Sequence, residues 1–371
     1  MTGDLTLYDG GKEAFPAILS AIGEAKESIY INMFIWRDDR IGREMAEAVL
    51  AAADRGVRVH IVKDRYGAVL ERAEECRRSL LHPRLTAIER LKGGVLHALY
   101  AREAKKPERG ESPLYRRIAT HPAIRLEADA HRADHSKFYI IDRELLFLGG
   151  INIEDKENGS DLCGRVYGDY MVRLEGEEYV NAFLAARRGE RPPKGTGLGF
   201  PMNRKETGLS EMESEYLSLI TSAERELLIV MAYLSPLPRF VGAIADAHRR
   251  GVRVTVMIPG EANFQSDTNR RTVKRLLRLT DNGITVLLSR KMLHTKLLLN
   301  EHSISFGSCN ITKKAFRQLD ELNLTIPNTD APLPSALRAS LAREMGEAIP
   351  VPSYRDISYR RLLALAEGLL I

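Results

Sequence analysis

One set of chemically active residue types occurs twice in this chain. In each half a histidine and a lysine lie two residues apart and are followed by an asparagine and then a carboxylate. The two sets are His135, Lys137, Asn152 and Asp169, and His294, Lys296, Asn310 and Glu321. The asparagine follows its histidine by 17 and 16 residues, and the acid by 34 and 27. A single His-x-Lys pair is common by chance, but two copies with matching partners indicate a functional site.

These residue types suit the cleavage of a phosphodiester bond. The reaction needs a nucleophile that attacks phosphorus, an acid that protonates the leaving oxygen, and positive charge near the non-bridging oxygens. One histidine from each half would supply the first two functions, since an unperturbed pKa near 6.5 makes both protonation states accessible. The sequence therefore predicts one catalytic site that combines His135 and His294.

The remaining members of each set have predicted functions around the phosphate. Lys137 and Lys296 would act as point charges on its oxygens, beside the amide donors of Asn152 and Asn310. Asp169 and Glu321 would each accept a hydrogen bond from the remote nitrogen of a histidine and fix its tautomer. The alternative for each acid is an ordinary surface residue. Such a site needs neither a metal ion nor a cofactor.

Apolar runs of strand type accompany both sets. The runs 138–141 and 297–299 follow the lysines, and the small-residue turns at 149–150 and 307–308 precede the asparagines. Side chains two residues apart lie on the same face of a strand. We therefore expect each histidine and its lysine to point the same way.

The rest of the chain also repeats. Amphipathic helices are predicted over 42–55 and 240–250, and each leads into the sequence Arg-Gly-Val-Arg-Val. Gly56 and Gly251 are predicted to take the left-handed conformation that ends a helix. The repeat offset is 195 residues at these glycines but 159 at the histidines, so the first half contains about 36 additional residues, between Gly67 and Asp134.

One helix is predicted within that insertion. Its apolar residues fall on one helical face: Ile88, Leu91, Val95 and Leu99. We expect this face to pack on its own domain. The alternative is a basic amphipathic helix at a lipid interface, with Arg90, Lys92 and Arg102 around the turn. A last helix, over 359–371, is expected to dock on the body of the protein.

The length of 371 residues predicts two domains. We place a first domain at 1–190 with its insertion at about 68–130, a linker at 191–208, a second domain at 209–345 and a helical segment at 346–371. The expected fold class is α/β. Each domain would be a mixed β-sheet flanked by helices, and a pseudo-two-fold axis would relate the two and bring the motif strands together.

Composition narrows the functional class. A hydrophobic content of 44% with 28% charged residues is typical of a soluble globular protein. Three scattered cysteines, Cys76, Cys163 and Cys309, predict an intracellular protein without a zinc cluster. No apolar run approaches the roughly 18 residues of a membrane span, and the N-terminus lacks a signal peptide pattern. The net charge of +5 suits phospholipid or nucleic acid.

The two motifs resemble the His-x-Lys-x4-Asp signature of the phospholipase D superfamily. Asp142 completes the first copy, whereas Glu301 stands where the second copy of the signature has Asp. The resemblance implies that both acids anchor a strand end. The runs 9–15, 62–67, 149–155 and 232–260 are similar to the cardiolipin synthase branch. The run after Asn310 departs from that branch, because its Asn-x-Thr form is also similar to nucleases of the superfamily.

The resemblance implies transfer of a phosphatidyl group between phospholipids through a phosphohistidine intermediate, or phospholipase D hydrolysis. His135 would be the nucleophile and His294 the acid. The expected partners are a phospholipid such as phosphatidylglycerol and an anionic membrane contacted peripherally. The expected location is cytoplasmic, at the inner membrane surface, with the chain as a monomer. Many members of the branch have N-terminal membrane spans; this sequence predicts none, so the expected membrane contact is peripheral.

Two alternatives remain at this stage. A metal-independent nuclease is favoured by the pI near 9.0 and by the basic run 270–275, although this run also fits the solvated face of a helix that buries Val273, Leu276 and Leu277. Only 6% of the residues are aromatic, and single-strand binders stack bases on aromatic rings, so lipid is favoured over nucleic acid. A non-enzymatic scaffold is disfavoured, because both motif sets are complete.

Overall fold

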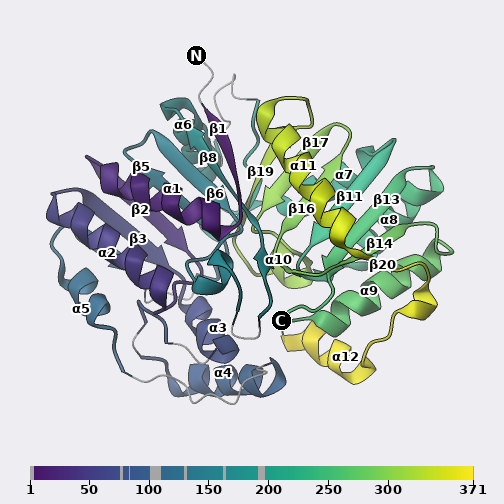
Figure 1. Cartoon of the computed structure of the whole chain (residues 1–371), viewed down its shortest axis with the longest axis horizontal. Coiled ribbons are helices and arrows are strands. Elements are labelled where there is room, and N and C mark those ends of the chain that lie inside the picture. The colour runs from purple at the N-terminus through teal and green to yellow at the C-terminus, as the bar shows by residue number, and fades with distance from the viewer. Residues whose placement is uncertain are drawn as a thin grey trace. The chain divides into compact units, whose positions relative to one another are not determined.

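A computed structural model describes residues 4–75, 78–82, 84–100, 110–128, 132–161, 164–190 and 197–370. The chain divides into two compact units, Met1–Leu184 and Ala185–Ile371 (Figure 1). Cys76 and Cys163, and Arg102 of the insertion, lie outside the described residues. No helix in the described part of the chain has the length and apolar character to cross a bilayer.

The first unit is built on a seven-stranded mixed sheet with the order β1-β8-β6-β5-β2-β3-β4. Strands β2, β3 and β4 are parallel, and β5, β6, β8 and β1 continue the sheet antiparallel. The strands are β1 (Leu5–Asp9), β2 (Ser28–Met33), β3 (Arg58–Lys63), β4 (Ile124–Glu127), β5 (Phe138–Ile141), β6 (Leu145–Gly149) and β8 (Tyr170–Glu175); β7 (Tyr167–Gly168) lies outside this sheet. The helices are α1 (Gly11–Glu24), α2 (Arg40–Asp54), α3 (Arg65–Glu75), α4 (Ala87–Tyr100), α5 (Pro113–Thr120) and α6 (Glu177–Arg187).

Strand alternation gives this sheet two apolar faces. Ile29, Ile31 and Tyr139 belong to a core that also includes the buried sides of α1 and α2. On the other face, the ring of Phe138 packs edge-on against Phe183 of α6 with a centroid separation of 5.0 Å. Residues two apart therefore share a face, as strand geometry requires.

The second unit is built on a nine-stranded sheet with the order β10-β9-β19-β17-β16-β11-β13-β14-β20. These strands are β9 (Met202–Arg204), β10 (Leu209–Ser210), β11 (Glu226–Met231), β13 (Arg253–Pro259), β14 (Thr285–Ser289), β16 (Lys296–Asn300), β17 (Ser303–Gly307), β19 (Glu321–Pro327) and β20 (Ile349–Pro350). Short strands are β12 (Leu234–Ser235), β15 (Met292–Leu293) and β18 (Ile311–Thr312). The helices are α7 (Met212–Ser222), α8 (Pro238–Arg249), α9 (Ser266–Leu279), α10 (Lys313–Arg317), α11 (Pro332–Glu347) and α12 (Arg361–Leu370).

The two sheets repeat one topology. The order β9-β19-β17-β16-β11-β13-β14 in the second unit corresponds strand by strand to β1-β8-β6-β5-β2-β3-β4 in the first. Gly56 and Gly251 have φ values of 92° and 91°, so both take the predicted left-handed conformation. The arginines that precede them, Arg55 and Arg250, donate to main-chain carbonyl oxygens in the last turns of α1 and α7, those of Ile22 and Ile220. The predicted α/β fold with a mixed sheet in each half is confirmed.

Two further sequence predictions are confirmed: the C-terminal helix docks on the body of the protein, and the basic run 270–275 lies on a helix that buries its apolar face. Helix α12 docks on α9, where Glu367 accepts a hydrogen bond of 2.7 Å from the main-chain N of Thr268. On α9 itself, Val273, Leu276 and Leu277 are fully buried. The basic run of α9 is therefore the outer side of a core helix.

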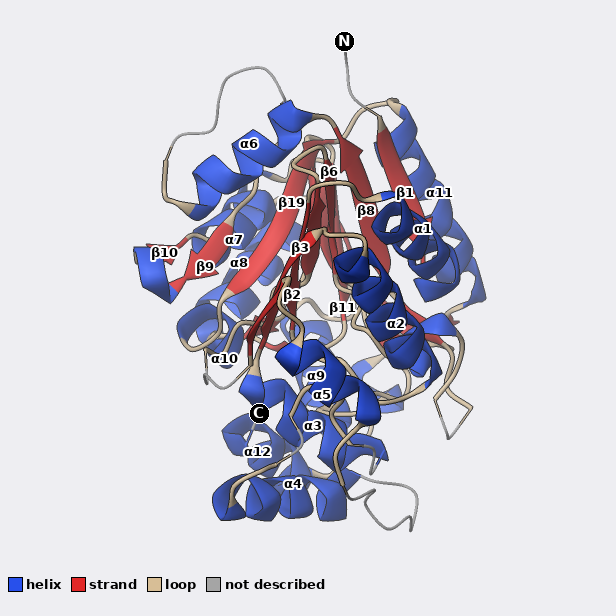
Figure 2. Cartoon of the chain, turned by 90° about the vertical axis from the view of Figure 1, so that its left-hand side faces the viewer, coloured by secondary structure: helices blue, strands red, loops and turns tan. Residues whose placement is uncertain are grey.

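The prediction for the insertion helix is wrong about which face packs. Helix α4 forms and packs on α3 (Figure 2), but through Glu89, Gly93 and Leu96. The apolar stripe of Ile88, Leu91, Val95 and Leu99 is exposed. The reason is a polar anchor on the opposite face, where Glu89 accepts a hydrogen bond of 2.7 Å from Arg65 of α3.

Candidate active site

The first histidine and lysine lie at one end of β5. His135 and Lys137 immediately precede the strand, and both are buried. The Nζ of Lys137 donates to the main-chain oxygen of His135 at 2.5 Å. Phe34 holds both residues: its ring lies edge-on to the imidazole at 4.7 Å between centroids, and the Lys137 ammonium lies 5.4 Å from the same ring. The pair is therefore fixed by packing as well as by the strand.

A buried polar network fixes the segment that carries this pair. The main-chain N of Asp134 donates to Asp64 at 3.0 Å, and Asp134 accepts from the main-chain N of Ser136 at 2.9 Å. Asn32 of β2 donates to the main-chain oxygen of Ser136 at 3.1 Å. Burial raises the pKa of Asp64 above its ordinary value. The sequence did not single out these residues as parts of the site, because the contacts join positions about 70 to 100 residues apart.

The turn after β6 brings the first asparagine and acid into one neighbourhood. Antiparallel pairing aligns Gly149 of β6 with Met171 of β8, two residues after Asp169. Asn152 and Asp169 are both buried, and Asp169 accepts from the main-chain N of Tyr170 at 2.9 Å. A Cβ at Gly150 would lie 2.1 Å from a carboxylate oxygen of Asp169. Glycine at this position therefore makes room for the acid.

The second set occupies the equivalent place in its own sheet. His294 precedes β16 and Lys296 begins it, and both are buried. The Nζ of Lys296 donates to the main-chain oxygen of His294, as in the first set. The ring of Tyr233 lies edge-on to His294 with a centroid separation of 6.4 Å. Tyr233 thus contacts this histidine much as Phe34 contacts His135.

Asn310 and Glu321 have defined hydrogen bonds. The main-chain N of Tyr233 donates to Oδ1 of Asn310 at 3.1 Å, which fixes the orientation of the amide and directs its NH2 group elsewhere. Ser308, at the position equivalent to Gly150, donates its hydroxyl to Glu321. Pairing of Gly307 with Asn323 places Glu321 where Asp169 stands in the first sheet. Where the first unit has space for its acid, the second has a serine that binds it.

The motif acids Asp142 and Glu301 hold the far ends of β5 and β16. Asp142 accepts three main-chain hydrogen bonds, of 2.8, 2.8 and 2.9 Å, from residues 26–28 at the start of β2. Glu301 accepts two, of 2.7 and 3.2 Å, from Glu224 and Glu226 at the start of β11. Burial acts to raise the pKa of each acid, but the main-chain donors outweigh it and hold both pKa values below the ordinary range. The longer side chain of Glu301 therefore makes the same kind of anchor as Asp142.

Removing one anchor should lower stability in a pH-dependent way. The folded pKa of Asp142 lies below its unfolded value near 4, so the carboxylate stabilises the fold above that pH and loses this effect as the pH falls through the folded pKa. We expect Asp142→Ala to lower the free energy of unfolding by about 1 kcal/mol at pH 7. Urea unfolding at pH 7 and pH 3 measures this. An equal cost at both pH values would contradict the anchoring role of the charge.

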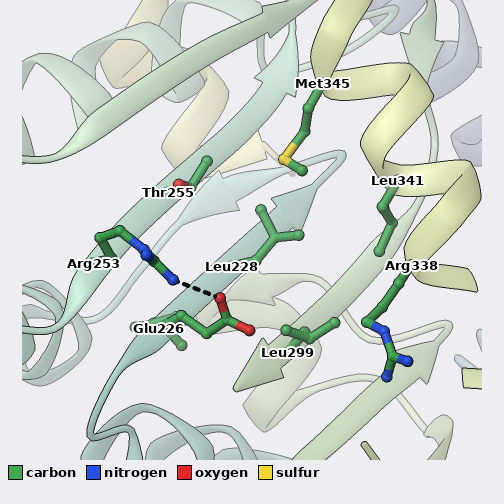
Figure 3. A pocket seen from close by; sticks show the side chains of 9 residues that line it. Glu226, Leu228, Arg253, Thr255, Leu299, Arg338, Leu341 and Met345 are labelled. Atoms are coloured by element: carbon green, nitrogen blue, oxygen red, sulfur yellow. Dashed lines mark hydrogen bonds and ion pairs between the residues drawn. The ribbon is translucent and has the colours of Figure 1, made fainter. Parts of the chain in front are cut away.

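A cavity of about 220 Å³ in the second unit lies away from this site. It is lined by residues of the sheet and of α11, and Figure 3 shows Arg253 paired with Glu226 at its edge. Glu226 begins β11 and Leu299 lies near the end of β16, so the cavity is at the strand ends opposite to His294. This cavity lies beside α11, away from the half-site, the name we give to the histidine, lysine, asparagine and acid of one unit.

The chain is similar to known proteins over most of its length. A family model described as "Cardiolipin synthase, PLD-like domain" matches residues 18–181 and 216–343. The chain is 30% identical over 345 residues to cardiolipin synthase B of Shigella flexneri and to that of Escherichia coli strain K12, with 87% of this chain and 76% of each relative covered.

A solved structure, that of phosphatidylserine synthase from Haemophilus influenzae Rd KW20, shows the same fold. Its TM-score is 0.69 at 13% identity, with 98% of this chain and 91% of that chain covered. At such low identity the likeness concerns the fold alone. The family match covers most of both repeats, including His135, Lys137, His294 and Lys296. The chain therefore belongs to the cardiolipin synthase family of phospholipase D-like enzymes.

Proposed function

We propose that this enzyme transfers a phosphatidyl group from one phospholipid, such as phosphatidylglycerol, to a hydroxyl group of a second. The observation that carries the proposal is the duplicated half-site: the same buried residue types stand at equivalent positions of two sheets with one strand order. A transfer in two steps needs one group that holds the phosphatidyl group between the steps and a second group that first donates and then removes a proton. One histidine from each repeat provides each of these functions.

In the first step the neutral imidazole of His135 attacks phosphorus and forms a P–N bond. The P–O bond to the departing alcohol breaks, and protonated His294 donates its proton to that oxygen. In the second step neutral His294 removes the proton of the incoming hydroxyl, whose oxygen attacks phosphorus while the P–N bond breaks. The first histidine is then neutral again, the second is protonated, and the phosphodiester has a new alcohol.

Lys137 and Lys296 are proposed to stabilise the negative charge that develops on the phosphate. Both ammonium groups are buried, and a buried cation has a large desolvation cost that a bound anion offsets. Asn152 and Asn310 are proposed as neutral donors to the same oxygens. The oriented amide of Asn310 supports this, because its oxygen is already used by Tyr233 and its NH2 group is the part that remains to donate.

Asp169 and Glu321 are proposed to orient the two histidines. Both acids are buried, and each begins or precedes the strand that follows the asparagine turn. A carboxylate on the remote imidazole nitrogen would select the reactive tautomer and stabilise the imidazolium. The close approach of Asp169 to Gly150 and the serine bound to Glu321 support fixed positions for both.

We also propose peripheral contact with an anionic membrane, at its cytoplasmic surface, because the substrate is a membrane lipid and the net charge is +5. Both motif copies are in one chain, so a monomer contains every residue that the mechanism uses.

The nuclease alternative is not favoured. Arg270 and Lys274 of the basic run on α9 bind the carbonyl oxygens of Gly260 and Ile357, at 2.8 and 2.6 Å.

Purified enzyme mixed with phosphatidylglycerol vesicles is expected to form cardiolipin and release glycerol. Added glycerol should suppress net product, because it competes as acceptor and returns the intermediate to phosphatidylglycerol. Thin-layer chromatography or lipid mass spectrometry measures this, with single-stranded DNA in a parallel reaction. Cleavage of the DNA with no phosphatidic acid, cardiolipin or exchanged lipid would contradict the proposal.

A further inference from the structure

An apolar stripe on α4 is exposed to solvent. The exposed fractions are 66% for Ile88, 69% for Leu91, 45% for Val95 and 41% for Leu99. These four residues are spaced three or four apart and so form one continuous line along the helix. We refer to them as the α4 stripe. Single exposed apolar residues are ordinary, but a line of four large ones marks an interaction surface.

The orientation of α4 is set by contacts on its other side. Thr86 and Glu89 form a reciprocal cap: Glu89 N donates to Thr86 Oγ1 at 3.2 Å, and Thr86 N donates to the Glu89 carboxylate at 2.6 Å. The same carboxylate binds Arg65, and the ring of His97 lies 3.1 Å from the carbonyl oxygen of Ala73. Rotating the helix to bury the stripe would break these contacts, so the exposure is built into the fold.

The second repeat has no such surface in the equivalent place. There one helix, α9, lies between β13 and β14 and buries Val273, Leu276 and Leu277, and only its last residue, Leu279, is a large exposed apolar side chain. In the first repeat α3, α4 and α5 lie between β3 and β4. The outward stripe therefore belongs to the additional residues of the first half and is not needed for the shared fold.

Charge beside the stripe points to one occupant. Lys92 is exposed and lies one helical turn from both Ile88 and Val95, and Arg90 is exposed on the same helix. A lysine at this place extends its ammonium group to lipid phosphates while its carbon chain lies along the apolar surface. A second copy of the chain would instead bring like charges together, which is unfavourable. An anionic phospholipid surface satisfies both the apolar line and the adjacent cations.

We propose that the α4 stripe docks this enzyme on an anionic phospholipid bilayer, with the four apolar side chains inserted at the level of the headgroups. This inference rests on the proposed function in one respect: it explains how an enzyme of membrane lipid reaches its substrate. The stripe contributes to binding of the bilayer and takes no part in the chemical steps.

The test is a vesicle flotation assay with the full chain. Vesicles of phosphatidylcholine alone and of phosphatidylcholine with phosphatidylglycerol are compared for the wild type and for the triple variant Ile88→Ser, Leu91→Ser, Val95→Ser. We expect the triple variant to lose at least about tenfold in binding to anionic vesicles. The matched control is Leu279→Ser, which removes a leucine that is 53% exposed at the end of α9 and should bind as the wild type does.

The double variant Arg90→Gln, Lys92→Gln separates the charge from the apolar contribution. We expect it to weaken binding to anionic vesicles and to leave the weak binding to neutral vesicles unchanged. Wild-type binding by the triple variant would overturn the proposal. Two leucines of α12, Leu362 and Leu365, are 84% and 56% exposed and offer the alternative apolar surface. If the double variant Leu362→Ser, Leu365→Ser loses binding while the triple variant still binds, the proposal is also overturned.

An activity measurement separates docking from chemistry. With a short-chain phosphatidylglycerol below its micelle concentration, the triple variant should keep wild-type turnover, whereas turnover on vesicles should fall with binding. Equal loss on both substrates would overturn the docking role. If the wild type forms no lipid product from either substrate, the proposed function fails, and the flotation result still decides the inference. Light scattering without lipid gives the remaining outcome: a wild-type dimer that the triple variant dissociates would make the stripe a contact between copies.

Discussion

Replacing either motif histidine by alanine should abolish phosphatidyl transfer while the fold remains intact. His135→Ala removes the proposed nucleophile and His294→Ala the proposed acid, so each variant should lose about 10⁴-fold or more in turnover. The double variant should be no slower than either single variant, because in the proposed mechanism the two groups act as one unit. Turnover is measured as cardiolipin formed from phosphatidylglycerol, with circular dichroism to show that each variant is folded.

The control for these variants is His302→Ala. Its imidazole is 56% exposed and lies just after the far end of β16, so its removal should leave turnover within about twofold of the wild type. Undiminished turnover in His135→Ala or His294→Ala would remove that histidine from the mechanism.

Replacing a motif lysine by methionine should cause the second largest loss. Methionine matches the unbranched shape of lysine but carries no charge, so Lys137→Met and Lys296→Met remove the cation while largely filling the same space. Negative charge on the phosphate oxygens is stabilised most in the transition state, so we expect kcat to fall by about 10² to 10³-fold with a smaller change in KM.

Lys26→Met is the matched control for the lysine variants. Lys26 is exposed and precedes β2 at the strand end opposite to His135, where its main-chain N binds Asp142. Its side chain should not affect turnover. A loss of less than tenfold in both motif variants would show that the buried ammonium groups serve the fold rather than the phosphate.

The sequence predicted the features that local patterns encode. Glycines after amphipathic helices marked the ends of α2 and α8, and apolar runs marked β5 and β16. Because the whole pattern occurs twice, each half supported the interpretation of the other. The shared strand order of the two sheets follows from that repetition.

The sequence could not predict features that depend on distant contacts. The apolar periodicity of α4 located the helix correctly, but it could not show that the pair of Arg65 with Glu89 fixes the opposite face inward. The same holds for Phe34 against His135 and for Asn32 bound to Ser136, which are about 100 positions apart in the chain. No local spacing connects such residues.

Glycine and serine at equivalent positions illustrate a third case. Gly150 and Ser308 were visible in the sequence as small residues in a turn. Only the structure places one against Asp169 and has the other donate a hydrogen bond to Glu321. The two halves therefore hold their acids in different ways: the first leaves space for Asp169 beside a glycine, and the second binds Glu321 through a serine hydroxyl.

The central claim, transfer through a phosphohistidine, is tested most directly by trapping the intermediate. With an activated donor such as phosphatidyl-p-nitrophenol, whose leaving group needs no protonation, the variant His294→Ala should form and accumulate it, because without the second histidine the incoming hydroxyl is not deprotonated and the P–N bond persists. The enzyme is quenched at alkaline pH after exposure to this donor, digested and mapped by mass spectrometry. We predict a phosphatidyl adduct on the peptide that contains His135 and none in His135→Ala. Product formation by the wild type with no adduct on either histidine peptide would contradict the account.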